Sequence, residues 1–213
     1  MVFVSFQINY LYYLFLVIIM SKKEQLEILR QKVSELNLPL KDTATNLVFG
    51  KGNPEARIMF IGEAPGANED IQGEPFVGAA GKNLDRLLNN ISLTIENVYI
   101  ANILKYRPPN NRNPNIEEIR SHTPYLIEQI RIIQPKFVCT LGNFSTKFVL
   151  AGFDAGKMKK ISGITSLHGK ISEVQLGTNV IKVFPLFHPA AMIYNRGLKE
   201  TIENDFLELQ KHL

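Results

Sequence analysis

The stretch RIMFIGEAPG, at residues 57–66, decides the fold of this chain. Its first half is a short apolar run that ends in Gly62, which is typical of a buried parallel strand. Strands that alternate with helices indicate an α/β fold, with a parallel sheet covered by helices on both faces. The spacing of apolar residues predicts further strands at 98–103, 137–141 and 180–186, and helices at 22–36, 81–89, 116–133, 142–150 and 198–212.

Three unusual polar segments follow three of these strands. They are residues 62–66 (GEAPG), Asn102 together with residues 107–112 (RPPNNR), and the pair His188-Pro189. Sheets of this kind bind their ligands beyond the carboxyl ends of the strands. The three segments are therefore expected to converge on one site.

Composition sets broad limits on the class of protein. The chain has 213 residues, of which 45% are hydrophobic, so one domain with a sizeable core is expected. A net charge of +4 suits a polyanionic partner, but it suits an ordinary soluble protein equally well. The single cysteine, Cys139, excludes an intrachain disulfide and any multi-cysteine metal site, and its apolar neighbours predict a buried side chain. We expect an intracellular, cytoplasmic protein.

Residues 1–19 form an apolar extension without charges. Their length is close to the ~20 residues of a membrane helix, but polar residues interrupt them. No basic region or cleavage site indicates a signal peptide. Since Met20 begins a sequence typical of a soluble protein, our hypothesis is that an upstream start codon adds residues 1–19 to a single domain at 20–213. A membrane anchor is the alternative.

Four motifs together resemble the family 4 uracil-DNA glycosylases. The first covers residues 62–81 (beginning GEAPGANED), and the second joins residues 99–102 (YIAN) to 107–114 (RPPNNRNP). Residues 134–142 and 188–195 resemble the third motif and the closing His-Pro motif. The motifs keep the family's order over residues 38–213. The resemblance implies a three-layer α/β/α fold with a four-stranded parallel sheet.

The resemblance also implies an activity. Family members hydrolyse the N-glycosidic bond of uracil in single- and double-stranded DNA, which starts base excision repair. Cleavage puts negative charge on the departing base, and by resemblance His188 donates a hydrogen bond to that charge at uracil O2. The amide of Asn102 offers a donor and an acceptor to one edge of the base. Glu63 stabilises the sugar cation or positions water, and Asn111 is a secondary candidate for that role.

Further residues are expected to hold the flipped base. By resemblance Phe76 stacks on the uracil ring, and Glu69 excludes the methyl group of thymine. Backbone amides around Gly62, Ala64 and Gly66 suit a close approach to base or phosphate oxygens. The alternative for Phe76 is an aromatic side chain of the core in an ordinary loop. The alternative for Glu69 is an acidic residue at the start of a helix.

The segment after the His-Pro pair is expected to contact DNA. Met192 and Ile193 are candidates for the wedge that fills the space left by the flipped base. Arg196 and Lys199, with Arg112 in the second motif, are expected to meet phosphates. For the two basic residues near the wedge, a solvated basic face is an equal alternative.

One departure from the family concerns its [4Fe–4S] cluster. The four cysteine positions correspond by alignment of the motifs to Glu35, Leu38, Tyr106 and His122, and none is cysteine. We therefore predict no cluster, no other cofactor and no metal. Packing of Leu38, Tyr106 and neighbouring apolar groups is expected to replace the cluster.

Two other classes of protein remain as alternatives. A binding module of the same fold would recognise uracil without cleaving it, but the Glu63, Asn102 and His188 set favours an enzyme. Covalent trapping of uracil-DNA is not expected, because residues 107–114 contain no histidine. A nucleotide-binding protein is disfavoured, because no G-x-x-x-x-G-K-[ST] sequence is present. A monomer is expected, as is usual for such enzymes.

Overall fold

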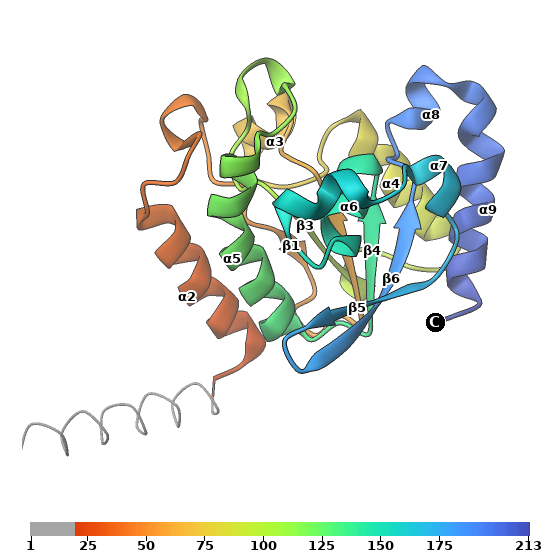
Figure 1. Cartoon of the computed structure of the whole chain (residues 1–213), viewed down its shortest axis with the longest axis horizontal. Helices are drawn as coiled ribbons and strands as arrows, with labels where there is room; N and C mark the ends of the chain where they lie inside the picture. Colours follow the sequence, from red (N-terminus) through yellow and green to blue (C-terminus); the bar gives the residue numbers. More distant parts are fainter. Residues whose placement is uncertain (1–19) are drawn as a thin grey trace, which may run out of the picture.

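The computed structural model describes residues 20–213, and the hypothesis about residues 1–19 lies outside this range. The described part is a three-layer α/β/α structure around one six-stranded sheet (Figure 1), with the strand order β1-β3-β2-β4-β6-β5. The strands are β1 (Lys51–Gly52), β2 (Ile58–Gly62), β3 (Val98–Asn102), β4 (Phe137–Leu141), β5 (Ser172–Leu176) and β6 (Asn179–Leu186).

The four expected strands form the parallel centre of the sheet, so the α/β class is confirmed. Strands β3, β2, β4 and β6 pair in parallel, while β1 and β5 add antiparallel edges. The expected number of four strands was therefore too low. The missed β1 has only two residues, and β5 is half exposed and joins β6 through a tight turn at Gly177, so neither carries a buried apolar run.

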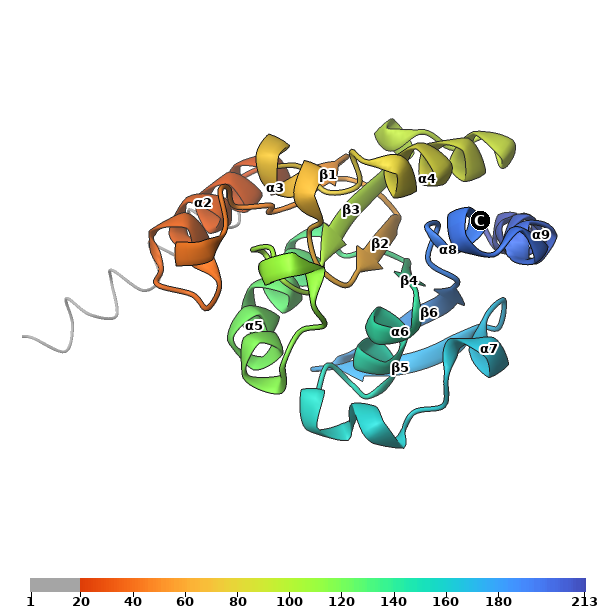
Figure 2. The same cartoon turned by 90° about the horizontal axis from the view of Figure 1, so that it is seen from above.

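Helices cover both faces of the sheet (Figure 2). The α-helices are α2 (Lys22–Glu35), α3 (Ala67–Gln72), α4 (Ala79–Asn90), α5 (Ile116–Ile133), α6 (Asn143–Leu150), α7 (Ile164–Leu167), α8 (Ala191–Tyr194) and α9 (Lys199–Gln210). Helices α2, α5 and α6 pack on one face, and α4 and α9 on the other. No helix among residues 20–213 is long and apolar enough to cross a membrane.

The strand residues divide between two apolar cores. In β2, Met59 and Ile61 point into the core beneath α2 and α5, while Ile58 and Phe60 point into the core beneath α4 and α9. This follows from the alternation of side chains along a strand. Cys139 of β4 is fully buried in the second core, as expected. The cores fix the strands, so the strand ends can hold polar side chains in set positions.

Candidate active site

The three segments that follow the strands converge, as the sequence analysis expects. Gly62 pairs with Asn102 at the ends of β2 and β3. A Cβ atom on Gly62 would overlap Oδ1 of Asn102 and lie 2.9 Å from Cε2 of Phe76. At the end of β4, a Cβ atom on Gly142 would lie 3.1 Å from Cβ of His188. Glycine at both strand ends therefore makes room for the polar and aromatic side chains that gather there.

Asn102 carries an unpaired acceptor. Its side chain is only 2% exposed. Within residues 20–213, its Oδ1 is the buried side-chain nitrogen or oxygen that has no hydrogen-bond partner. A buried acceptor without a donor costs free energy, so such atoms are rare in folded proteins and are retained where they have a role. Asn102 is therefore poised to accept a hydrogen bond from a bound molecule.

His188, just after β6, is a neutral imidazole. Its Nδ1 accepts a hydrogen bond from the backbone N–H of Ala190 at 3.2 Å, so the ring proton is on Nε2. Burial lowers the pKa of His188 to about 4, and the nearby Glu69 carboxylate only partly opposes this shift. At neutral pH the imidazole is thus an uncharged donor through Nε2.

Phe76 faces the imidazole of His188. The two ring centroids are 5.6 Å apart and their planes differ by 29°. The backbone of Phe76 is left-handed, with φ of 52°. Two side chains hold this unusual turn: Nζ of Lys51 donates to the Phe76 carbonyl at 3.2 Å, and Oε1 of Glu69 accepts from the backbone N–H groups of Val77 and Gly78. Glu69 therefore supports the loop that carries the aromatic ring.

Glu63 completes the strand-end cluster. It directly follows Gly62, and its carbonyl accepts from the N–H of Leu104 at 3.1 Å. Burial raises the pKa of its carboxyl group above the ordinary value. The neighbouring Ala64 packs against the core beneath α5, and Gly66 begins α3 next to the carboxylate of Glu69.

Asn111 is the one predicted catalytic candidate that the structure does not bring to this cluster. It is exposed in the loop after β3, with a left-handed backbone, and its Oδ1 accepts from Nε of Arg107 at 2.8 Å. No hydrogen bond or ion pair in the described part of the chain joins it to His188, Asn102 or Phe76. Its role in catalysis stays a prediction.

The predicted DNA-contacting residues after His188 divide into buried and exposed ones. Met192 is only 8% exposed because it packs into the second core. Ile193 is 46% exposed, and Arg196 and Lys199 lie on the surface. Tyr194, which the sequence analysis passed over, is 87% exposed. Of the two wedge candidates, only Ile193 is exposed, and its neighbour Tyr194 is exposed as well.

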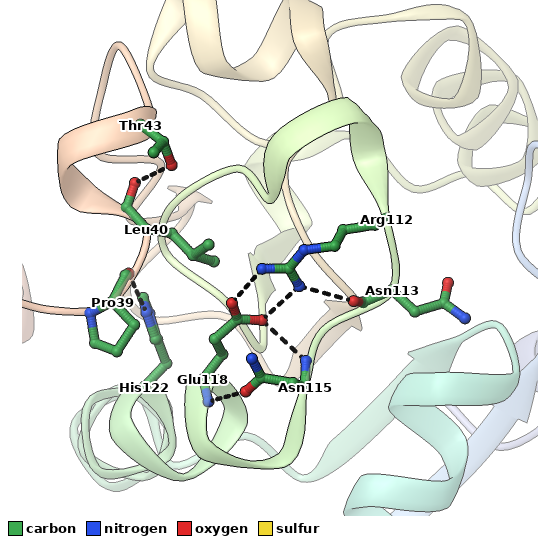
Figure 3. A network of polar contacts seen from close by, with 8 residues as sticks. All are labelled: Pro39, Leu40, Thr43, Arg112, Asn113, Asn115, Glu118 and His122. Atoms are coloured by element: carbon green, nitrogen blue, oxygen red, sulfur yellow. Dashed lines mark hydrogen bonds and ion pairs between the residues drawn. The ribbon is translucent and has the colours of Figure 1, made fainter.

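Arg112, expected to meet a phosphate, has a partner within the protein (Figure 3). Its guanidinium group pairs with both carboxylate oxygens of Glu118 on α5. Glu118 is 5% exposed and also accepts from the N–H of Asn115, which caps the helix. Arg112 therefore secures the loop to the start of α5, which gives it a structural role.

The four positions of the family's cysteines do not suit an iron–sulfur cluster. Glu35 is exposed, while Leu38 and Tyr106 are buried and supply no thiolate. Both ring nitrogens of His122 already have protein partners. No group of three or more metal-binding side chains occurs among residues 20–213. The donor atoms present do not match those that hold a cluster.

Lys105 was missed by the sequence analysis, although it lies between the two parts of the second motif. It is fully buried, which lowers its pKa to about 7. Its Nζ donates to the carbonyl oxygens of Asn102 and Phe49 at 2.9 and 3.3 Å and to Oε1 of Gln129 at 2.6 Å. A lysine among apolar residues carries no sequence signal of burial, because two of its three acceptors, on Phe49 and Gln129, come from distant segments.

Comparison with known proteins shows the family to which this chain belongs. The model of the uracil DNA glycosylase superfamily matches residues 49–210. A type-4 uracil-DNA glycosylase from Archaeoglobus fulgidus is 43% identical over 183 residues, which are 86% of this chain and 90% of the relative. One from Sulfurisphaera tokodaii is 46% identical, covering 78% of this chain and 74% of the relative, and one from Thermotoga maritima is 40% identical, covering 83% and 88%. The chain belongs to the uracil DNA glycosylase superfamily.

Proposed function

We propose that this chain is a uracil-DNA glycosylase, which hydrolyses the bond between uracil and deoxyribose and so starts base excision repair. The observation that carries this proposal is the unpaired buried Oδ1 of Asn102, which lies beside Phe76 and near His188. The similarity to type-4 enzymes over most of the chain agrees with it. Both single- and double-stranded DNA are proposed as substrates.

The proposed base site reads the edge of a flipped uracil. The ring stacks on Phe76, Oδ1 of Asn102 accepts from N3–H, and the Asn102 amide donates to O4. Cytosine presents an acceptor at N3 and a donor at position 4, so it would leave both groups unmatched. Glu69 is proposed to lie near C5 of the bound uracil, where the methyl group of thymine would collide with its side chain. Backbone amides at Gly62, Ala64 and Gly66 are proposed to approach the oxygens of the bound base.

The proposed chemistry starts with breakage of the C1′–N1 bond. Its electron pair leaves with uracil, and the charge collects partly on O2, where Nε2–H of His188 donates a hydrogen bond. A neutral imidazole can do this without losing its proton. Glu63 stabilises the positive sugar and accepts a proton from the water that attacks C1′. The products are free uracil and an abasic site in an intact strand.

DNA is proposed to bind across the strand ends beside α8. Ile193 and Tyr194 are exposed there and fill the space that the flipped base leaves. Arg196 and Lys199 contact phosphates, so binding weakens as the salt concentration rises. Arg112 is assigned to its ion pair with Glu118 instead.

The proposed enzyme works as a monomer without a cofactor. Its cysteine count and the side chains at the four cluster positions suit this proposal. Since its substrate is the cell's DNA, a cytoplasmic place of action is part of the proposal.

The test is uracil release by the full chain from a single-stranded oligonucleotide, with U·G and U·A duplexes beside it. His188→Ala and Asn102→Ala are expected to lose most of the activity, while His212→Ala, at an exposed histidine, is expected to keep it. Folding is checked by circular dichroism. If well-folded protein binds uracil-DNA but releases no uracil, the chain is a binding module and not an enzyme.

A further inference from the structure

His122 joins two distant segments of the chain by using both of its ring nitrogens. It is fully buried on α5. The backbone N–H of Lys105 donates to Nδ1 at 3.0 Å, so the ring proton is on Nε2, which donates to the carbonyl of Pro39 at 3.1 Å. Figure 3 shows the second of these bonds, which spans 83 positions of sequence.

The two segments joined in this way are important for the site. Pro39 lies in the arm that follows α2, and Lys105 comes three residues after Asn102. The four positions that correspond to the family's cysteines lie in or beside the same segments, and His122 is itself one of them. Tyr106, another of the four, packs edge-on against the His122 ring, with centroids 6.1 Å apart. The sequence analysis expects apolar packing alone to replace the cluster. The hydrogen bonds of His122 add to that packing.

Three consecutive backbone N–H groups anchor the segment after β3, and this bond is one of them, while the Lys105 carbonyl also accepts from the N–H of Val48 at 2.9 Å. The N–H groups of Ile103 and Leu104 donate to the carbonyls of Gly62 and Glu63. The next N–H, that of Lys105, donates to His122. The first two anchors hold the segment to the strand end, and the third holds it to α5.

Lys105 connects this anchor to Asn102. Its fully buried Nζ donates to the Asn102 carbonyl at 2.9 Å and to Oε1 of Gln129 on α5 at 2.6 Å. A shift of the Lys105 backbone would move this donor away from the Asn102 carbonyl. The placement of the Asn102 side chain, whose Oδ1 is unpaired, would shift with it.

We infer that His122 stands in for the missing cluster as the tie between the N-terminal arm and the segment after β3, and that it positions Asn102 through Lys105. His122 is thus a positioning residue for recognition of the base. The inference rests on the proposed function for its effect on uracil, whereas the tie itself does not depend on that function.

The test compares three variants of the full chain. His122→Phe keeps a buried ring but removes both hydrogen bonds. His122→Gln offers an acceptor and a donor on one planar group, so it can restore both. Leu126→Ala, one turn further along α5 and fully buried in the same core, is the matched control that weakens packing without touching the tie.

Three readouts are measured for each variant: the melting temperature, kcat/KM on uracil-DNA, and the inhibition constant of free uracil. His122→Phe is expected to lower kcat/KM and raise the inhibition constant by roughly 10- to 100-fold, because small shifts of a positioned group have effects of that size. His122→Gln is expected to recover most of this loss. Leu126→Ala is expected to lower the melting temperature with little change in the inhibition constant.

Two further measurements separate the tie from the activity. Hydrogen exchange of the Lys105 amide is expected to be slow in wild type and His122→Gln and fast in His122→Phe. Iron and sulfide in anaerobically purified protein are expected at background. Stoichiometric iron, or equal effects of His122→Phe and Leu126→Ala on uracil inhibition, would overturn the inference. Wild type without uracil release would overturn the proposed function, while the exchange data would still decide whether the tie exists.

Discussion

The ring of Phe76 stacks on the imidazole of His188, and Gly62 leaves the space in which Phe76 and Asn102 meet. A residue from the loop between α3 and α4 and one that follows β6 thus face each other. Because Phe76 has a left-handed backbone, its position depends on the contacts around it. Substitutions beside the pair are expected to affect activity more than stability.

Gly62→Ala is expected to reduce kcat/KM by roughly 100-fold, since the added methyl group would displace the Asn102 amide or the Phe76 ring. The matched control is Gly163→Ala, where the new Cβ atom would meet only Oδ1 of Asn143 at an ordinary 3.6 Å. Single-turnover kinetics on uracil-DNA would measure the difference. Equal activity of the two variants would show that the strand end tolerates a larger side chain.

Asn102→Ala is expected to separate activity from stability. It removes the base-reading amide, so kcat/KM should fall by about 10²–10³. It also removes a buried acceptor that has no partner, so the free energy of unfolding should stay within about 1 kcal/mol of wild type or rise. Urea unfolding measures the second effect. A marked loss of stability would mean that Oδ1 has a partner within the protein.

The acid side of the pH–rate profile is expected to report Glu63. Burial raises the pKa of its carboxyl above the ordinary 4.5, whereas the pKa of His188 is lowered to about 4. As the pH falls, Glu63 therefore gains its proton before His188 becomes charged, and kcat/KM falls first with Glu63. In Glu63→Gln, kcat/KM should be lower at every pH, and its fall at acid pH should disappear. An unchanged limb in that variant would assign the titration to another group.

Stability is expected to fall between about pH 6.5 and pH 4. His122 and His188 both have pKa values of about 4 in the folded protein and an ordinary value of 6.5 when unfolded. In this window the unfolded chain binds more protons, so acid favours unfolding by up to about 1.4 kcal/mol per pH unit for each histidine. Urea unfolding at several pH values would give the slope. His122→Gln should reduce the slope of the unfolding free energy against pH by the contribution of one histidine. An unchanged slope would contradict a neutral buried His122.

Arg112→Ala is expected to act on stability and not on the salt dependence of DNA binding. It leaves the buried Glu118 carboxylate without its guanidinium partner, which should lower the urea midpoint of unfolding. Arg196→Ala, by contrast, should lower the slope of log K against log salt by about 1. Fluorescence anisotropy with a uracil-containing oligonucleotide at several salt concentrations measures both slopes. A reduced slope of log K against log salt for Arg112→Ala would show that Arg112 contacts DNA phosphates.

Much of the fold could be predicted from local sequence. Helix α5 has the predicted bounds of 116–133, because Asn115 and Glu118 form a capping box at its start. Strand β4 also has its predicted bounds, since its five residues are all buried. The convergence of Gly62, Asn102 and His188 followed from the rule that parallel strands present their carboxyl ends to one side.

The remainder depended on contacts between distant segments. The burial of Met192 is set by the rotation of a four-residue helix, which is too short to show a periodic pattern. The roles of Lys105 and His122 arise from acceptors and donors that lie up to 83 positions away. Nothing in the neighbouring residues of either side chain indicates these partners.

The tie made by His122 has a consequence for how molecules of this protein reach their working state. A metal cluster is assembled by other proteins from supplied iron and sulfide, so the fraction of working enzyme would follow that supply. The two hydrogen bonds of the imidazole, one accepted and one donated, form as the chain folds, and they hold as long as the ring stays neutral. The tie would therefore form in every folded copy whatever the supply of iron.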